Sequence, residues 1–93
     1  MSKELNEIRN MIDRIDDSII DLLSTRKKLV EQIALLKKNL NIKVIDNKRE
    51  KELLKRLKEK ARQKGLDEKL IDTVYEIILK NSRKKQNEIK QQD

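Results

Sequence analysis

The fold of this chain is decided by the stretch LLSTRKKLVEQIALLKK, residues 22–38. Its apolar residues recur at steps of three and four, which is the spacing of one face of an amphipathic helix. Arg26 takes a place in that apolar row. A permanent cation in a hydrophobic face is unfavourable unless the charge is paired or reaches water, so this arginine needs an explanation.

The same apolar row extends beyond this stretch in both directions. Its members, each three or four residues after the one before, are Leu5, Ile8, Ile12, Ile15, Ile19, Leu22, Arg26, Leu29, Ile33, Leu36 and Leu40. This is the a and d pattern of a heptad seam, and only position 26 is not apolar. Ser2 can cap the start of a helix, and the pattern dissolves in NLNIKVID, residues 39–46. The sequence therefore predicts one helix from about residue 4 to about residue 39.

A second, shorter helix is predicted to begin in the stretch DNKRE, residues 46–50. Asn47 with Glu50 three residues later resembles a capping box, and Asp46 is the alternative cap. The apolar stripe of this helix consists of Leu53, Leu54, Leu57 and Ala61. Its length and composition are those of a short surface helix with one buried face.

The end of the second helix and the start of a third are predicted by three consecutive residues. Gly65 and Leu66 match a Schellman motif, in which glycine adopts the left-handed conformation and leucine makes the hydrophobic contact. Asp67 can then cap a helix whose stripe consists of Leu70, Ile71, Val74, Ile77 and Ile78. At steps of four, this stripe continues into Ser82 and Gln86. Either the helix end emerges into solvent there, or the two polar side chains face a site.

The composition favours an all-α fold and a single domain over residues 1–93. Charged residues make up 44% of the chain, and there is one Gly and no Pro, so turns are few and helices are long. The first helix would be about 50 Å long, whereas a compact domain of this size has a radius of gyration of about 12 Å. The shorter helices cannot cover its seam. We therefore expect an intertwined homodimer in which the long helices of two subunits pair.

The missing residue types exclude several kinds of chemistry. Without His or Cys there is no disulfide, thiol nucleophile, imidazole base or ordinary zinc site. No apolar run is long enough to span a membrane, and a cytoplasmic location is expected. The net charge of +7 indicates an anionic partner. Tyr75 is the only aromatic residue, which makes a single-strand nucleic-acid surface a poor fit.

Arg26 has two interpretations from the sequence alone. It can reach water or form a buried ion pair that sets the register of the helices, or it can form an anion site inside the bundle. A bundle interior that holds a cation, the Ser82 hydroxyl and the Gln86 amide resembles a ligand pocket. Arg9 and Lys37 flank the seam at equivalent heptad positions, from which their side chains can lean inward. The carboxylates of the first helix are assigned to a solvated face and not to a metal site; they are Asp13, Asp16 and Asp17.

These residues resemble the motif set of a known family, the all-helical (AroQ-type) chorismate mutases. The family has an Arg near the N-terminus, a mid-helix Arg, a later Lys, a loop Asp, an Arg-Glu pair, and a Ser and a Gln or Glu one turn apart. In this chain the matching residues are Arg9, Arg26, Lys37, Asp46, Arg49, Glu50, Ser82 and Gln86. The spacings agree without an insertion, and the likeness covers almost the whole chain. The resemblance implies an intertwined helical dimer with two active sites.

The resemblance also implies the reaction, which is the Claisen rearrangement of chorismate to prephenate on the route to phenylalanine and tyrosine. This unimolecular step needs no nucleophile and no cofactor. By resemblance, Arg9 and Arg26 hold the two carboxylates of the substrate, and Lys37 and Gln86 donate to the ether oxygen as its bond breaks. The resemblance also implies that Asp46 and Glu50 accept the ring hydroxyl of the substrate. Ser82 would help to hold a carboxylate, and Arg49 would add to the positive charge of the site.

Helix geometry restricts how these residues can meet. Arg9 and Lys37 lie 28 residues apart, or about 42 Å along one helix, so one small ligand cannot touch both on the same chain. Arg9 is therefore expected from the partner subunit. Arg83, next to Ser82, occupies a position that is often apolar in relatives, and we expect it to face solvent.

Two other functions compete with the mutase. An isochorismate pyruvate-lyase has the same fold and a similar cationic pocket, and only substrate tests separate the two activities. A basic helical dimer that binds nucleic acid is a different class of protein. It predicts strongly salt-dependent DNA binding, and it leaves Arg26, Ser82 and Gln86 without a role.

Overall fold

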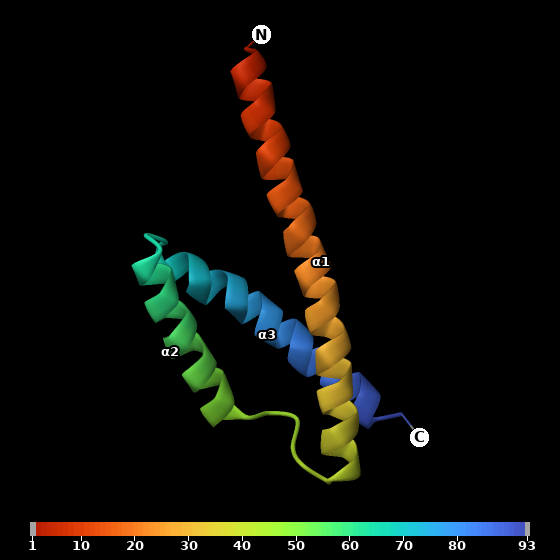
Figure 1. Ribbon diagram of the computed structural model, residues 1–93. Coiled ribbons are helices and arrows are strands. Elements are labelled where there is room, and N and C mark those ends of the chain that lie inside the picture. The colour runs from red at the N-terminus through yellow and green to blue at the C-terminus, as the bar shows by residue number, and fades with distance from the viewer. Residues whose placement is uncertain (1, 93) are drawn as a thin grey trace.

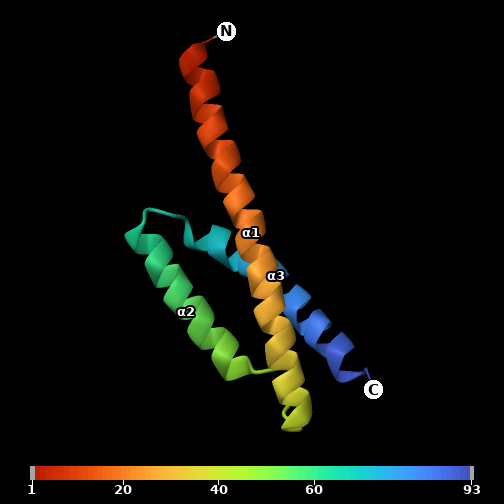
Figure 2. The ribbon, with the colours of Figure 1, turned by 45° about the vertical axis from the view of Figure 1, so that its right-hand side comes forward.

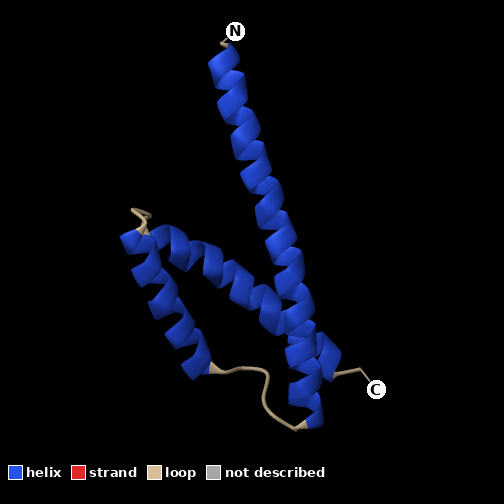
Figure 3. Ribbon diagram, in the orientation of Figure 1, coloured by secondary structure: helices blue, strands red, loops and turns tan. Residues whose placement is uncertain are grey.

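The computed structural model describes residues 2–92 as three α-helices joined by short loops (Figure 1; Figure 3). The helices are α1 (Lys3–Asn39), α2 (Asn47–Gln63) and α3 (Glu68–Lys90). Within the described residues no strand is present, so the all-α prediction is confirmed. No helix of this part of the chain is both long enough and apolar enough to cross a membrane.

Helix α1 begins and ends close to the predicted residues. The Ser2 hydroxyl oxygen accepts a hydrogen bond from the Leu5 amide at 3.1 Å and caps the helix. At the other end, Asn41 adopts a left-handed conformation with φ of 56°, and the Ile42 amide donates to the Lys37 carbonyl at 2.8 Å. This is a Schellman motif with asparagine in place of the usual glycine. It turns the chain back, so that the loop after α1 runs toward α2.

The α2 N-cap and the α2–α3 turn have local causes that the sequence shows. Asp46 is the N-cap of α2 and accepts from the Arg49 amide at 3.0 Å, so the alternative cap is the one used and the capping box from Asn47 to Glu50 is not formed. Gly65 has φ of 73°, and the Leu66 amide donates to the Ala61 carbonyl at 2.8 Å, as the predicted Schellman motif requires. The next helix, α3, is capped by Asp67, whose carboxylate accepts from the Lys69 amide.

The three helices do not form a compact bundle. Helices α2 and α3 form an antiparallel hairpin, and the second half of α3 crosses the C-terminal half of α1 (Figure 1; Figure 2). The N-terminal half of α1 extends beyond the other two helices (Figure 1). The radius of gyration is 17.1 Å and the longest dimension is 57 Å, against about 12 Å for the radius of gyration of a compact domain of this length.

The core of one chain is small and lies around α3. Its buried apolar residues are Val30, Ala34, Val44, Leu53, Ala61, Leu79 and Ile89. Ser82 and Gln86 are buried beside them, at 8% and 9% exposure, so the alternative in which the end of α3 emerges into solvent is wrong. In contrast, every apolar residue of the predicted α1 seam, from Leu5 to Leu40, is at least 39% exposed. Helix α1 therefore packs on α3 through one stripe and leaves its longer apolar seam without cover.

Candidate active site

A cavity of about 300 Å³ lies where α1, the loop after it, the start of α2 and the end of α3 meet. Its volume is at the lower end of the range for small-molecule sites. Its apolar lining consists of Val30, Ile33, Val44, Leu53 and Leu79. Its polar and charged lining consists of Arg26, Lys37, Asp46, Arg49, Glu50, Ser82, Arg83 and Gln86. The structure thus brings together every predicted site residue except Arg9.

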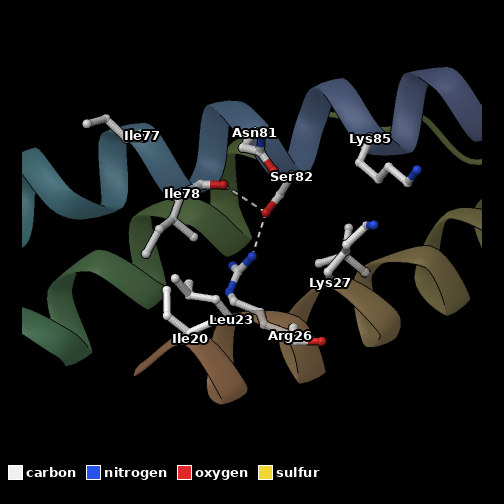
Figure 4. Close-up of a pocket in the computed structure, with 11 residues that line it drawn as sticks. Ile20, Leu23, Arg26, Lys27, Ile77, Ile78, Asn81, Ser82 and Lys85 are labelled. Carbon is white, nitrogen blue, oxygen red and sulfur yellow. Dashed lines mark hydrogen bonds between the residues drawn. The ribbon is translucent and has the colours of Figure 1, made fainter. Parts of the chain in front are cut away.

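Arg26 is held by α3 and not by an acidic partner. Its Nη1 donates to the Ser82 hydroxyl oxygen at 2.5 Å, and that hydroxyl donates to the Ile78 carbonyl at 2.9 Å (Figure 4). The Ser82 hydroxyl therefore donates its hydrogen bond to the helix backbone, and its oxygen accepts the hydrogen bond from the guanidinium. A guanidinium has five N–H donors, so most of them remain for a ligand. The arginine in the apolar row is a half-buried cation aimed into the bundle.

Lys37 and Gln86 form a second connection between α1 and α3. Lys37 Nζ donates to Gln86 Oε1 at 2.9 Å and to the Val44 carbonyl at 2.8 Å. An ammonium has three donors, so one N–H of Lys37 is left over. Because the amide oxygen of Gln86 is engaged, its NH₂ group also remains as a donor. One N–H of Lys37 and the two N–H of Gln86 are thus available at the cavity wall.

Helix α2 contributes its first turn to the cavity. The Asp46 carboxylate caps the helix through the Arg49 amide, the role predicted from the sequence as the alternative to Asn47. Arg49 is exposed and Glu50 is half-buried. The N-terminus of α2 also carries the positive end of the helix dipole, which favours anions nearby.

Arg83 corrects the prediction that it faces solvent. Its side chain lines the cavity, and Nη1 lies 2.6 Å from Glu50 Oε1, which joins the end of α3 to the start of α2. The two side chains are 32% and 23% exposed. The sequence signal that Arg83 faces inward was its position, four residues and about one helical turn after the core residue Leu79.

The charges that line the cavity have an excess of cations. Arg26, Lys37, Arg49 and Arg83 face two carboxylates, those of Asp46 and Glu50. A cavity with low-polarity walls concentrates such a field, so this one suits a small ligand with two negative charges. Within residues 2–92, no three acidic residues gather in the way that metal ligands do.

Comparison with known proteins assigns the chain to a family. The profile of the family described as chorismate mutase type II matches residues 8–87. This chain belongs to that family. A chorismate mutase from Methanocaldococcus jannaschii is 30% identical over 83 residues, which are 89% of this chain and 84% of that protein.

Two further relatives extend the comparison. A bifunctional chorismate mutase/prephenate dehydratase from Buchnera aphidicola subsp. Schizaphis graminum is 35% identical over 79 residues, but this chain spans only 20% of that protein. A solved structure of a conserved hypothetical protein from Pyrococcus furiosus superimposes with a TM-score of 0.73 at 35% identity. The superposition covers 92% of this chain and 99% of that one.

One residue of the motif set lies outside the cavity in this chorismate mutase family member. Arg9 is exposed and belongs to the extended N-terminal half of α1 (Figure 1). It precedes Arg26 by 17 residues, or about 25 Å along the helix. A single chain therefore brings seven of the eight motif residues to the cavity.

A second cavity, of about 480 Å³, lies on the neighbouring face of the α1–α3 crossing. Arg26, Val30 and Ser82 line both cavities. The other lining residues are Ile20, Leu23, Ser24, Lys27, Ile77, Ile78, Asn81 and Lys85 (Figure 4). The apolar part of this lining comes from Ile20, Leu23 and Val30 of α1 and from Ile77 and Ile78 of α3.

Proposed function

We propose that the chain catalyses the rearrangement of chorismate to prephenate in the 300 Å³ cavity, as a chorismate mutase with a single domain over residues 1–93. The observation that carries the proposal is the convergence of Arg26, Lys37 and Gln86 on one cavity, in a chain that belongs to the chorismate mutase type II family. Each of the three keeps N–H donors for a ligand after its contacts within the chain are counted.

The first task of the site is to select a conformation. Chorismate carries two carboxylates, and its side chain must fold over the ring before the new C–C bond can form. Arg26, held at a fixed angle by Ser82, can bind one carboxylate with two parallel N–H donors. A second cation at a fixed distance binds the other carboxylate, and the bent conformer is retained. Holding reacting atoms in a near-attack geometry lowers the barrier without any chemical participation of the protein.

The second task is to stabilise charge that grows at one atom. In the rearrangement the ether C–O bond breaks as the C–C bond forms within the same molecule, and negative charge develops on the ether oxygen. Lys37 Nζ donates a hydrogen bond to Gln86 Oε1 at 2.9 Å, so the remaining donors of both side chains are held in place before the substrate binds. Such preorganised donors bind the transition state more tightly than the ground state. We assign the ring hydroxyl of the substrate to Glu50 and the backbone at Asp46.

The proposal includes a homodimer that completes the site with Arg9. If two α1 helices (Lys3–Asn39) pair antiparallel with full overlap, residue n of one lies opposite residue 42 − n of the other. Arg9 then lies opposite position 33, and Ile33 lines the cavity between Arg26 and Lys37 along α1. In a parallel pair, Arg9 would lie opposite its own copy, about 36 Å from that position. Only antiparallel pairing brings Arg9 to the site.

The exposed surface supplies a driving force for this pairing. The ten apolar seam residues are about half exposed, and covering the rest of each side chain is worth roughly 1 kcal/mol. The sum over the ten residues of one subunit is already comparable to the association cost of about 4–15 kcal/mol. Because the second subunit contributes the same amount, the total exceeds that cost. The same antiparallel register places residues 12–22 of the partner against the second cavity, from Ile20 to Val30.

The test is the loss of chorismate's ultraviolet absorbance on addition of the purified protein, with Arg26→Ala beside it. We expect turnover by the wild type and a loss of at least about 10²-fold in the variant, the magnitude typical for one preorganised donor. Folding of the variant is checked by circular dichroism. A folded wild-type protein that leaves chorismate unchanged refutes the proposal. Isochorismate and duplex DNA, the latter over a range of salt concentrations, then test the two competing functions.

A further inference from the structure

The Arg83–Glu50 pair is a feature of this cavity that the roles assigned above do not use. Nη1 of Arg83 lies 2.6 Å from Oε1 of Glu50, and these residues come from α3 and α2. Arg83 directly follows Ser82, which holds Arg26, and lies three residues before Gln86, which holds Lys37. One and a half turns of α3 thus contact three charged side chains of the cavity.

Glu50 needs a partner for two reasons. It lies in the first turn of α2, where its flexible side chain could rotate toward solvent, as a surface carboxylate normally does. It also adds a negative charge to a cavity that we assign to a dianion. An unpaired carboxylate close to a bound anion is repelled by it, and this repulsion is stronger in a partly enclosed site than in water.

We propose that Arg83 is a positioning residue, which fixes Glu50 as the acceptor for the ring hydroxyl of the substrate and offsets its charge. The inference rests on the proposed mutase function and adds to it a residue that sets affinity for the hydroxyl-bearing end of the substrate. Arg83 uses Oε1 of Glu50, so Oε2 remains to accept a hydrogen bond. The guanidinium acts through Glu50 and need not touch the substrate.

Two other roles for Arg83 make different predictions. A simple staple between α2 and α3 would contribute to stability and leave substrate affinity unchanged once the protein is folded. A direct contact between Arg83 and a substrate carboxylate would contribute to affinity whether or not residue 50 is charged. A positioning role requires that the effect of Arg83 on affinity depends on Glu50.

The experiment is a double-mutant cycle on chorismate turnover with Arg83→Met and Glu50→Gln, alone and combined. Met keeps the length and helix propensity of the side chain and removes its charge and donors. The matched control is Lys84→Met, which removes the same charge from the next residue, an exposed one outside the cavity. Circular dichroism, thermal unfolding and the oligomeric state are measured for every variant.

For a positioning role we expect Arg83→Met to raise KM about tenfold with a change in kcat of less than about threefold, the pattern of lost substrate binding. In the Glu50→Gln background the same substitution should change KM less than about twofold, because the two residues act as a unit. Lys84→Met should leave KM within about twofold of the wild type. Arg83→Lys should show a much smaller rise in KM than Arg83→Met, because lysine restores the positive charge, although it lacks the planar guanidinium.

The inference is overturned by additive effects of the two substitutions on KM, or by an unchanged KM in a folded Arg83→Met protein. If Arg83→Met does not fold, the cycle is run with Arg83→Lys, whose smaller rise in KM must likewise vanish in the Glu50→Gln background. Wild-type protein without chorismate turnover overturns the mutase function and this inference together. Wild-type turnover with additive variants overturns the inference alone.

Discussion

The two halves of α1 have the same sequence pattern and different surroundings. The C-terminal half packs Val30 and Ala34 against α3 and carries Arg26 and Lys37 into the cavity. The N-terminal half has no residue buried within the chain, although its apolar row is as regular. A hydrophobic stripe of a single helix does not stay in water when a complementary surface exists. Within the chain, only the stripe of Val30 and Ala34 in the C-terminal half is buried. In the homodimer that we propose, a second copy covers the N-terminal half.

The largest effect is expected from an experiment that tests whether each active site contains residues of both subunits. Arg9→Ala and Lys37→Ala dimers should each lose at least about 10²-fold in activity, because each lacks a cation at both sites. After the two proteins are mixed, unfolded and refolded together, half of the dimers contain one chain of each kind. Those dimers have one site with both residues intact, so about a quarter of wild-type activity should return.

The control for this mixture is Arg26→Ala with Lys37→Ala, two changes on the same side of the proposed site. Each mixed dimer then has one defect in each site, and no activity should return. Recovery in the control, or none in the test mixture, would show that Arg9 does not act on the partner's site.

A charge near the middle of α1 should separate the subunits. Ile19→Glu places a carboxylate in the seam near the centre of the antiparallel pair, where it opposes position 23 of the partner and would lose its contact with water. We expect a monomer by analytical ultracentrifugation at micromolar concentration, with activity reduced about 100-fold or more. Asn10→Glu adds the same charge to the opposite side of the helix and should remain dimeric. An active Ile19→Glu monomer would contradict the shared site.

The Lys37–Gln86 contact in the packed half of α1 can be tested by making the activity depend on pH. Gln86→Glu replaces a permanent amide donor by a group that donates only when protonated. The neighbouring Lys37 favours the ionised carboxylate and lowers its pKa. Activity should therefore be restored as the pH falls, whereas the wild type should need no acid. A kcat/KM profile that is flat with pH in Gln86→Glu would contradict the role of this residue.

The smallest effect is expected in the turn that joins α2 to α3. Gly65 has φ of 73° and open space where a Cβ would lie, so Gly65→Ala introduces backbone strain and no clash. The free energy of unfolding should fall by about 1 kcal/mol, measured by urea denaturation, with kcat and KM unchanged. Lys64→Ala, at a residue with negative φ, is the control. A larger loss with altered kinetics would mean that this turn also shapes the site.

The local structure was predictable because local residues cause it. The apolar period of α1, the caps at Ser2 and Asp67, and the left-handed Gly65 act within a few residues of the chain, and each appears as predicted. The one cap left open, between Asp46 and Asn47, is a choice between neighbours of similar propensity. The Schellman turn at Asn41 was not predicted, because asparagine takes the left-handed conformation less regularly than glycine does.

The sequence predicted which residues line the site, but it did not predict which of them contact one another. Arg26, Ser82 and Gln86 interrupt apolar stripes, which marks them in the sequence. The partner of Arg83 is not marked in this way, because Glu50 lies 33 residues away and any of several nearby carboxylates would satisfy a solvent-facing arginine equally well. The position of a long charged side chain depends on which helix crosses it.

The sequence by itself determined three helices, their ends, an all-α fold and an apolar seam too long for one chain, since these follow from periodicity, caps and length. Only the tertiary structure decided that the polar end of α3 is buried, that Ser82 holds Arg26, that Lys37 holds Gln86, and that Arg83 pairs with Glu50. The physical reason is the crossing of α3 over α1 and its hairpin with α2. That packing brings together donors and acceptors that lie 33 to 56 residues apart, and no local pattern specifies which of them will meet.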